Sequence, residues 1–472
     1  MEETPVTLWY STLGSGDGQD VATRGYLKAL MKVKYRGLRL PPSISTNLVR
    51  FDRDLSEFSD LAKPVVNVMK PLKRVMAGDP RIGTTRVFPS LDDDGNQLLD
   101  NTGRKVETVI TISEGSVDLD VEQERTSNAK VVTRCVVIHH DPAAVCRNYV
   151  NLVPLGRPHG VAFVGVTVWE ASHIPEAVAV MLSELDAVVV PSRHAKDALV
   201  KANISIPVHV IPHSFDETHW PVPGVDEIAE PVNRERYVFY TVATPIERKN
   251  LKGLVRAYLK AFQGQKDIVL RIKSVGDVSA INDLIREALK ESGVDDSRSP
   301  SVKAFVGKWP IDKVRAFHLA GDCYVSATRG EGFDLPVMEA KLCGSNVITT
   351  GWGASREILE FAQNPANDVL VPYKLIPVQG MYGIGCYEPD QQWADPDEEA
   401  LIEAMRSMAQ RRVGPDRASW VHLRNVLGPV AVGKQFSDVL TMAMDTAKSQ
   451  PEPEVENHGE EFRNEVQEKA VE

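Results

Sequence analysis

The strongest signal in the sequence lies at Arg329-Gly-Glu-Gly-Phe-Asp-Leu-Pro-Val-Met-Glu-Ala340. An apolar run precedes it, and a helix is expected to begin within it. Asp334 is a good N-cap for that helix, and Pro336 is tolerated in its first turn. Glu331 then lies in the loop after a strand, and Glu339 lies just over one turn inside the helix.

The expected helix start presents the backbone N–H groups of residues 332–335. Phosphate or sugar oxygens bind well there, because these groups have no partner within the helix. Each flanking carboxylate accepts two hydrogen bonds and therefore suits the vicinal hydroxyls of a ribose or a hexose. A capped helix with solvent-facing glutamates is the alternative, but it does not account for the Gly-Glu-Gly-Phe sequence before the cap.

Short apolar runs alternate with helical patterns on both sides of this stretch. Such runs are typical of buried parallel strands, and their alternation with helices predicts sheets covered on both faces. A helix is expected over residues 250–262, where apolar residues recur along one helical face. The expected strands cover residues 6–10, 131–138, 161–168, 187–190 and 208–211 in the first half of the chain, and 237–243, 268–273, 302–305, 323–325 and 347–349 in the second half.

The expected fold class is α/β, with two Rossmann-like domains facing each other across a cleft. Residues 1–215 form the expected N-terminal domain, and residues 237–415 form the C-terminal domain. A proline-rich linker is expected over residues 216–236. Helices over residues 416–448 are expected to pack back on the N-terminal domain, before an acidic disordered tail over residues 449–472.

One segment, residues 62–130, lacks this alternation. Short apolar runs separated by Gly-containing turns predict an antiparallel, β-rich insertion in the N-terminal domain. Ordinary turn chemistry explains Asp92–Asp94 more simply than a metal site does.

Composition excludes several classes of protein. The chain has 472 residues, of which 43% are hydrophobic and 25% charged, and these values exclude wholesale disorder, collagen and coiled coil. No apolar stretch approaches the length of a membrane-spanning helix, and no signal peptide is visible. The five cysteines form neither a Cys-x-x-Cys pair nor a disulfide framework. A cytoplasmic location is therefore expected.

Charge is unevenly distributed along the chain. The net charge is −11, whereas residues 24–39 hold six Lys or Arg and no acid. Arg24, Lys28 and Lys32 fall on one face of an expected helix. Two interpretations stay open for this face, a solvated stripe and a surface for an anionic acceptor.

Two further cations, Arg248 and Lys249, follow the strand expected over residues 237–243. The carboxyl ends of parallel strands face the cleft where open α/β sheets bind ligands. Adjacent cations at this position would neutralise a diphosphate and stabilise its departure.

The stretch from Glu331 to Glu339 resembles the signature of glycosyltransferase family 4, whose members are retaining, sugar-nucleotide-dependent transferases of the GT-B fold. Residues 320–326 before it, and residues 344–350 with Glu357 after it, follow the order of that family. So do residues 186–192 and 210–213. The resemblance covers roughly residues 161–393 and leaves the insertion and the tail outside.

The resemblance implies a role for each matching residue. Glu339 would bind the donor ribose, and Glu331 would contact the donor sugar near its reacting carbon. The amides of Gly332, Phe333, Asp334 and Leu335 would hold sugar and phosphate, and Lys249 would bind the diphosphate. No cofactor or metal is required by this scheme.

The chain departs from the family pattern at two positions. Thr244 stands where an arginine is usual, so Arg248 is expected to supply the missing charge. Asp334 stands where a small residue is usual, which places negative charge close to the sugar and could alter donor preference.

Candidate residues also lie in the N-terminal domain. Gly16, in a Gly-rich loop, is expected over the donor phosphates, although a tight turn explains it equally well. His139 and His140 end a strand on the cleft side, and His140 is favoured as the contact to the donor sugar; a core histidine is the alternative. Glu170, next to Trp169, is expected to position an acceptor, with a tryptophan packed at the domain seam as the alternative.

The expected function is transfer of a sugar from a nucleoside-diphosphate sugar to an acceptor hydroxyl of a glycan, a lipid-linked compound or another anionic molecule. Two alternatives stay open. One is a DNA glycosyltransferase acting on a hydroxymethylated base, and the other is a non-catalytic sugar-nucleotide-binding or scaffold protein.

Overall fold

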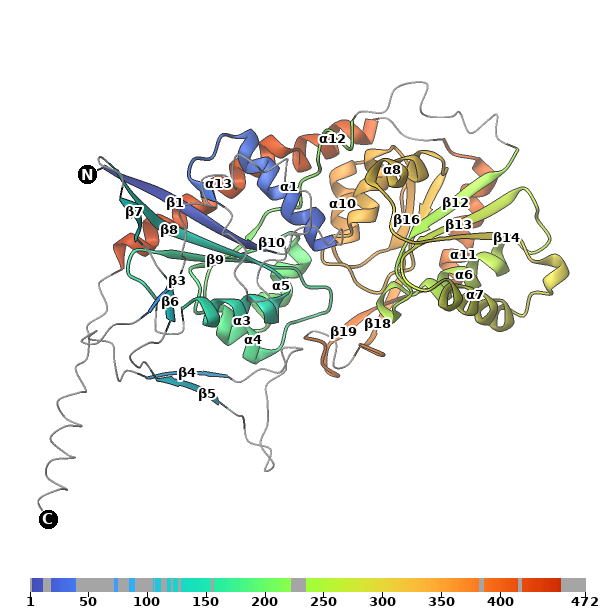
Figure 1. The fold of residues 1–472 in the computed structure, drawn as a ribbon. Helices are drawn as coiled ribbons and strands as arrows, with labels where there is room; N and C mark the ends of the chain where they lie inside the picture. Colours follow the sequence, from blue (N-terminus) through green and yellow to red (C-terminus); the bar gives the residue numbers. More distant parts are fainter. Residues whose placement is uncertain are drawn as a thin grey trace, which may run out of the picture.

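The structure is a computed structural model with two lobes, each built on a parallel sheet (Figure 1). The described residues are 2–11, 18–39, 72–74, 85–89, 105, 107–111, 117–119, 122–125, 129–153, 157–221, 235–381, 386–414 and 418–450.

The first lobe is a parallel sheet in the order β11-β10-β9-β8-β1-β2, with β7 added antiparallel to β8. Residues of β9 and β10 are all buried, as expected for strands covered on both faces. The elements of the first lobe are β1 (Glu2–Ser11), α1 (Gly18–Lys32), β2 (Leu38–Arg39), β7 (Glu122–Arg125), β8 (Ala129–His139), α3 (Pro142–Leu152), β9 (Ala162–Val166), α4 (Glu176–Leu182), β10 (Ala187–Val190), α5 (Arg193–Lys201) and β11 (Val208–Val210).

The second lobe has the strand order β14-β13-β12-β15-β16-β17, all parallel. The order reverses between β12 and β15, and ligands of doubly wound sheets bind at such a point. Its elements are β12 (Tyr237–Val242), η4 (Glu247–Lys249), α6 (Leu251–Ala261), β13 (Ile268–Ser274), α7 (Val278–Ser292), η5 (Asp296–Arg298), β14 (Ser301–Val306), α8 (Ile311–Leu319), β15 (Cys323–Val325), α9 (Leu335–Leu342), β16 (Asn346–Thr350), α10 (Ala354–Ala362), β17 (Val369–Val371) and α11 (Glu398–Arg411).

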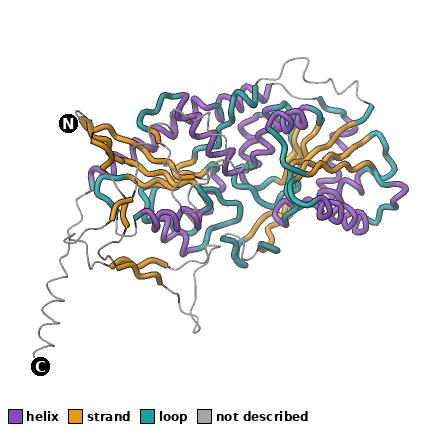
Figure 2. Tube along the Cα trace, viewed as in Figure 1, coloured by secondary structure: helices purple, strands orange, loops and turns teal. Residues whose placement is uncertain are grey.

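The expected fold class is confirmed, because each expected strand overlaps an observed one and helices cover the sheets (Figure 2). Local capping also follows the sequence. The Ser192 hydroxyl accepts from the N–H of Ala195 at the start of α5, and Asp334 caps α9. All five cysteines are buried, and none of them forms a disulfide bond.

Short antiparallel pairs lie outside the two sheets. β4 (Thr85–Pro89) pairs antiparallel with β5 (Glu107–Thr111), as the β-rich insertion predicts. β3 (Leu72–Arg74) pairs with β6 (Val117–Leu119), and in the second lobe β18 (Tyr373–Pro377) pairs with β19 (Gln392–Pro396). The expected turn at Asp92–Asp94 and the tail beyond residue 450 lie outside the described residues.

The chain ends its described part with α12 (Ala418–Leu427) and α13 (Pro429–Ser449), and α13 runs back along α1 of the first lobe (Figure 1). The Phe436 ring packs 5.0 Å from the ring of Tyr26 and 5.3 Å from that of Trp9. A Cβ on Gly433 would lie 2.2 Å from the carbonyl oxygen of Ala29, so the two helices cross in close contact.

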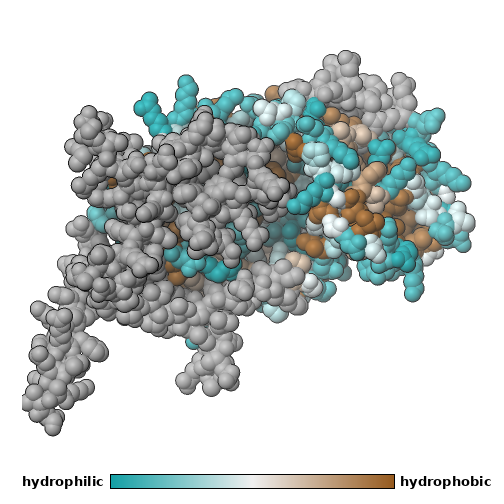
Figure 3. All heavy atoms as spheres, in the orientation of Figure 1, coloured by the Kyte–Doolittle hydropathy of each residue, from teal (hydrophilic) through white to brown (hydrophobic). Residues whose placement is uncertain are grey.

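The surface of the second lobe mixes hydrophilic and hydrophobic residues on the face that Figure 3 shows. Its exposed apolar side chains include Val278, Leu370 and Leu375. Within the described part of the chain, no helix combines the length and the apolar character needed to cross a bilayer.

Candidate active site

A cavity of about 480 Å³ lies between the two domains, at the carboxyl ends of strands from both sheets. It brings together most of the residues singled out from the sequence. From the second domain it is lined by Thr244, Arg248, Lys249, Glu331, Gly332, Phe333, Asp334, Leu335 and Glu339, and from the first by His140 and Glu170. Gly16 lies outside the described residues.

The Glu331 carboxylate is bonded by three neighbouring side chains of the second domain. This buried carboxylate accepts from the Lys249 ammonium at 2.6 Å, from Arg248 Nη1 at 3.1 Å and from the Thr328 hydroxyl at 2.7 Å. Burial opposes ionisation, but the charges of Lys249 and Arg248 outweigh it and hold the pKa of Glu331 below its ordinary value. Glu331 is therefore ionised at neutral pH.

Arg248 links Glu331 to the first domain. Its Nη1 also donates to the carbonyl oxygen of Gly330 at 2.6 Å, and its Nη2 lies 3.3 Å from a Glu170 oxygen. The Tyr387 hydroxyl donates to the other Glu170 oxygen at 3.2 Å. The residue expected to position an acceptor is thus engaged in an ion pair between domains.

Trp169, the neighbour of Glu170, is a seam residue. Its Nε1 donates to the carbonyl oxygen of His173 at 2.6 Å, and its ring lies 5.0 Å from that of Tyr387. At 3% exposed, it has little surface to offer an acceptor. Trp169 is therefore packed at the seam between the domains, as the alternative interpretation of the sequence proposed.

The loop before α9 closely approaches the first domain. A Cβ on Gly332 would lie 2.1 Å from Cγ2 of Val168 and 2.9 Å from the carbonyl oxygen of Trp169. The Ser192 hydroxyl donates to the carbonyl oxygen of Gly332 at 2.7 Å. No N–H group of residues 332–335 donates to another described residue, so these donors are available to a ligand.

Asp334 is turned toward the second domain. Its backbone is left-handed, with a φ of 72°, and its side chain accepts from the Ser355 hydroxyl at 2.6 Å and, more weakly, from the N–H of Val337 at 3.4 Å. Burial and then the charge of Glu331 raise the pKa of Asp334 to about 7. The extra carboxyl of this site is therefore partly protonated at neutral pH.

The two adjacent histidines differ in environment. His139 is buried, its Nδ1 lies 2.9 Å from the Thr23 hydroxyl, and burial lowers its pKa well below the ordinary value. His140 is more exposed, and its Nδ1 lies 2.5 Å from the Asp141 carboxylate. Both border the cavity, but His139 is a core histidine and His140 is the more accessible of the two.

Lys273 and His213 also line the cavity, and neither was assigned a role from the sequence. Lys273 is the penultimate residue of β13 and is 4% exposed, with Nζ donating to the carbonyl oxygens of Ser274 and Gly307 at 2.8 and 2.6 Å. His213 lies against the ring of Phe333, at 4.7 Å, and burial lowers its pKa to about 3. Lys273 could have been recognised from the sequence, because it is a cation at the carboxyl end of the strand expected over residues 268–273.

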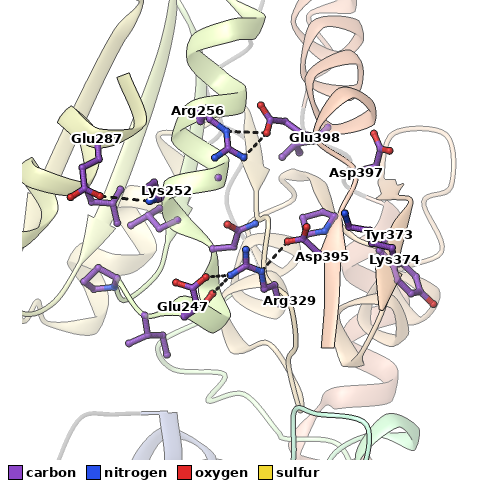
Figure 4. A pocket seen from close by; sticks show the side chains of 18 of the residues that line it. Glu247, Lys252, Arg256, Glu287, Arg329, Tyr373, Lys374, Asp395, Asp397 and Glu398 are labelled. Carbon is purple, nitrogen blue, oxygen red and sulfur yellow. Dashed lines mark hydrogen bonds and ion pairs between the residues drawn. The ribbon is translucent and has the colours of Figure 1, made fainter. Parts of the chain in front are cut away.

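Arg329 lies in the loop that carries Glu331, and its side chain binds residues of η4 and β19 (Figure 4). Its Nε donates to Asp395 at 3.0 Å, and its Nη1 donates to the carbonyl oxygen of Glu247 at 2.9 Å and pairs with the Glu247 carboxylate. Its own N–H donates to the carbonyl oxygen of Arg248 at 2.8 Å. The surrounding cavity of about 670 Å³ is lined by charges that pair among themselves, such as Arg256 with Glu398.

The cations of α1 are paired with acids. Arg24 Nε donates to Asp20 at 2.9 Å, Lys28 pairs with Asp216, and Lys32 lies 3.1 Å from Glu217. Arg24 and Lys28 border a separate cavity of about 430 Å³, which shares the lining residue Val21 with the 480 Å³ cavity between the domains. The charges of this helix face, for which a solvated stripe and a surface for an anionic acceptor both stay open, are largely neutralised by neighbouring acids.

Part of the chain matches a known protein family. Residues 235–376, less than a third of the chain, match the family model described as glycosyl transferases group 1. No curated protein matches the sequence.

Solved structures match over nearly the whole chain. The structure of HepE from Anabaena in complex with UDP and glucose has a TM-score of 0.53 at 9% identity, covering 93% of this chain and 99% of that one. Sucrose-phosphate synthase from Thermosynechococcus elongatus has a TM-score of 0.55 at 12% identity, covering 94% and 99%. At these identities the similarity establishes the fold alone. The chain therefore has the GT-B fold, and the family match in its second domain supports a glycosyltransferase.

Proposed function

We propose that this protein is a retaining glycosyltransferase that moves a sugar from a nucleoside-diphosphate sugar to an acceptor hydroxyl. One observation carries the proposal: Lys249 and Glu331 pair at 2.6 Å beside the free N–H groups of residues 332–335. A cation, a carboxylate and hydrogen-bond donors thus meet at the switch point of a parallel sheet, where such sheets bind nucleotides.

Lys249 is assigned to the diphosphate. An ammonium has three N–H donors, so Lys249 can keep its contact with Glu331 and still donate to phosphate oxygens. The N–H groups of residues 332–335 supply further donors. Because these groups are already in place, they stabilise the charge of the departing diphosphate, and losing one such contact costs on the order of a hundredfold or more in rate.

The carboxylates are assigned to the sugars of the donor. Glu339 accepts from the hydroxyls of the ribose, and Glu331 faces the transferred sugar. The lowered pKa of Glu331 keeps it charged, so that it stabilises the positive charge of an oxocarbenium-like transition state. His140 approaches the same sugar from the first domain.

Arg248 is assigned to positioning the Glu331 carboxylate, and not to binding the diphosphate. Both of its terminal nitrogens are engaged, by Glu331 and Gly330 on one side and by Glu170 on the other. A guanidinium held in this way fixes the Glu331 carboxylate and leaves the diphosphate to Lys249.

The acceptor is proposed to be a glycan, a lipid-linked compound or another anionic molecule that enters from the first domain. The cavity bordered by Arg24 and Lys28 lies next to the donor cavity and offers room for it. A DNA acceptor with a hydroxymethylated base stays a prediction, and most of the β-rich insertion over residues 62–130 lies outside the described residues.

The test is calorimetric titration of the full-length chain with UDP, GDP and ADP, followed by incubation with the matching sugar nucleotides. UDP is the first probe because the Anabaena HepE structure contains it. Wild type is expected to bind one of these diphosphates, and Lys249→Ala is expected to bind it at least tenfold more weakly.

Lys252→Ala is the matched control, because Lys252 lies three residues away and pairs with Glu287 and Glu291 on the surface. Binding by wild type of none of the diphosphates overturns the proposal. Binding without any hydrolysis or transfer of the sugar nucleotide favours the non-catalytic alternative instead. The anomeric proton coupling of the product, measured by NMR, tests retention.

A further inference from the structure

His318 lies directly behind Glu339 in the second domain. It is the penultimate residue of α8 and is 0% exposed. Its Nε2 lies 3.4 Å from a carboxylate oxygen of Glu339, and its Nδ1 lies 3.2 Å from the Tyr240 hydroxyl. That hydroxyl lies 2.6 Å from the hydroxyl of Ser345. A chain of polar groups therefore runs from the interior of the domain to the cavity wall.

The ring is held from several sides. It packs 5.4 Å from the ring of Tyr240, 5.8 Å from that of Trp220 and 6.2 Å from that of Tyr324, with which it is stacked. A side chain enclosed in this way cannot leave Glu339 by changing rotamer without disturbing the core. The position of Nε2 relative to the carboxylate is thus set by packing.

The hydrogen-bonding properties of these polar groups indicate which atom donates its proton at each contact. Burial raises the pKa of Tyr240, so its hydroxyl keeps its proton. If that proton is donated to Nδ1, the histidine carries its own proton on Nε2 and presents it to Glu339. Nε2 makes no hydrogen bond of good geometry to any described residue, and Glu339 is the acceptor within its reach.

We propose that His318 is a positioning residue that holds one oxygen of Glu339 and directs the other to the ribose, and so makes the site selective for ribose over 2′-deoxyribose. This inference rests on the proposed function, in which Glu339 binds the ribose. A buried carboxylate fixed for two hydroxyls is left partly unsatisfied when one is absent, which penalises the deoxy ligand. A carboxylate free to rotate would adapt to either ligand and discriminate less.

The experiment compares the affinity of the full-length protein for UDP, GDP and ADP with that for their 2′-deoxy counterparts, by calorimetry. For the diphosphate that binds, wild type is expected to prefer the ribose form by about tenfold or more. His318→Leu is expected to bring that ratio close to one, mainly by weakening the ribose form. His318→Gln, which keeps an N–H donor, is expected to restore part of it.

Three further variants keep the outcome interpretable. Tyr240→Phe removes the hydroxyl that directs the Nε2 proton and is expected to lower the ratio even if His318→Leu fails to fold. His209→Leu, on β11 of the other domain, is expected to leave the ratio unchanged. Glu339→Ala is expected to abolish the preference.

The outcomes separate the two proposals. If Glu339→Ala removes the preference while folded His318→Leu and Tyr240→Phe both keep it, the inference about His318 is wrong and the proposed function stands. If Glu339→Ala keeps the preference, or if wild type shows no preference or binds none of the diphosphates, the assignment of the ribose to Glu339 fails and the inference fails with it.

Discussion

Glu170 of the first domain and Arg248 of the second form an ion pair across the domain seam, with 3.3 Å between Oε1 and Nη2. Because Arg248 also bonds Glu331, the relative position of the domains is coupled to the carboxylate that faces the proposed sugar site. Glu357 adds a second tie between domains, since its carboxylate accepts from the N–H groups of Arg193 and His194, at the start of α5, at 2.9 and 2.8 Å.

Glu170→Gln is expected to slow sugar transfer by roughly tenfold or more while leaving the affinity for the nucleoside diphosphate within about twofold, because small misplacements of reacting groups are costly in rate. Glu170 acts through Arg248 and is assigned no contact with the nucleotide. Donor kcat and KM, measured separately, check this. Glu176→Gln, on the exposed start of α4, is the control. A fall in affinity equal to the fall in kcat would assign Glu170 to ligand binding instead.

Glu331→Ala is expected to reduce transfer on the order of a hundredfold or more, yet to bind the nucleoside diphosphate as tightly as wild type or more tightly. In the structure Glu331 neutralises Lys249 and Arg248, so its removal leaves more positive charge for the diphosphate. Turnover and calorimetric affinity together test this, with circular dichroism to verify folding. Turnover at the wild-type rate would remove Glu331 from the mechanism.

Asp334→Asn is expected to gain stability relative to wild type as pH rises from about 4 to about 7. The folded pKa is raised to about 7 from 3.8, so the folded protein holds a proton that the unfolded chain releases. The stability from that proton is complete below pH 3.8 and is lost as pH rises through 7. Asparagine tolerates the left-handed backbone and does not titrate.

Urea unfolding of both proteins at several pH values between 4 and 8 measures this difference. The gap in free energy of unfolding should grow with pH and level off above about 7. A gap that is constant over this range would mean that Asp334 titrates alike in the folded and unfolded chains.

Gly332→Ala is expected to destabilise the protein by about 1–3 kcal/mol and to impair transfer, because the added methyl overlaps Val168 and approaches the carbonyl oxygen of Trp169. Thermal unfolding and turnover measure the two effects. The double variant Gly332→Ala, Val168→Ala relieves the overlap with Cγ2 and should recover part of both. Wild-type stability of the single variant would show that the loop and the first domain are not in close contact.

Periodicity and capping rules were sufficient for the local structure. The alternation of apolar runs with helical patterns predicts both sheets, because strands buried on two faces must be apolar along their length. Asp334 was recognisable as an N-cap from residue type alone. Lys249 and Glu331 follow parallel strands, and parallel strands end at one edge of a sheet, so their proximity also follows from the sequence.

The partners of charged side chains depended on how separate elements of the chain pack together. Arg248 meets Glu170, and Lys28 meets Asp216, through contacts between residues far apart in the chain that no local pattern encodes. His318 lies behind Glu339 because α8 and α9 pack side by side over the same sheet. Local patterns were thus enough to predict which segments form strands and helices, and which edge of each sheet carries the charges. Which charges neutralise one another and which remain for a ligand became visible in the folded chain, because that depends on distances of a few ångströms between separate elements.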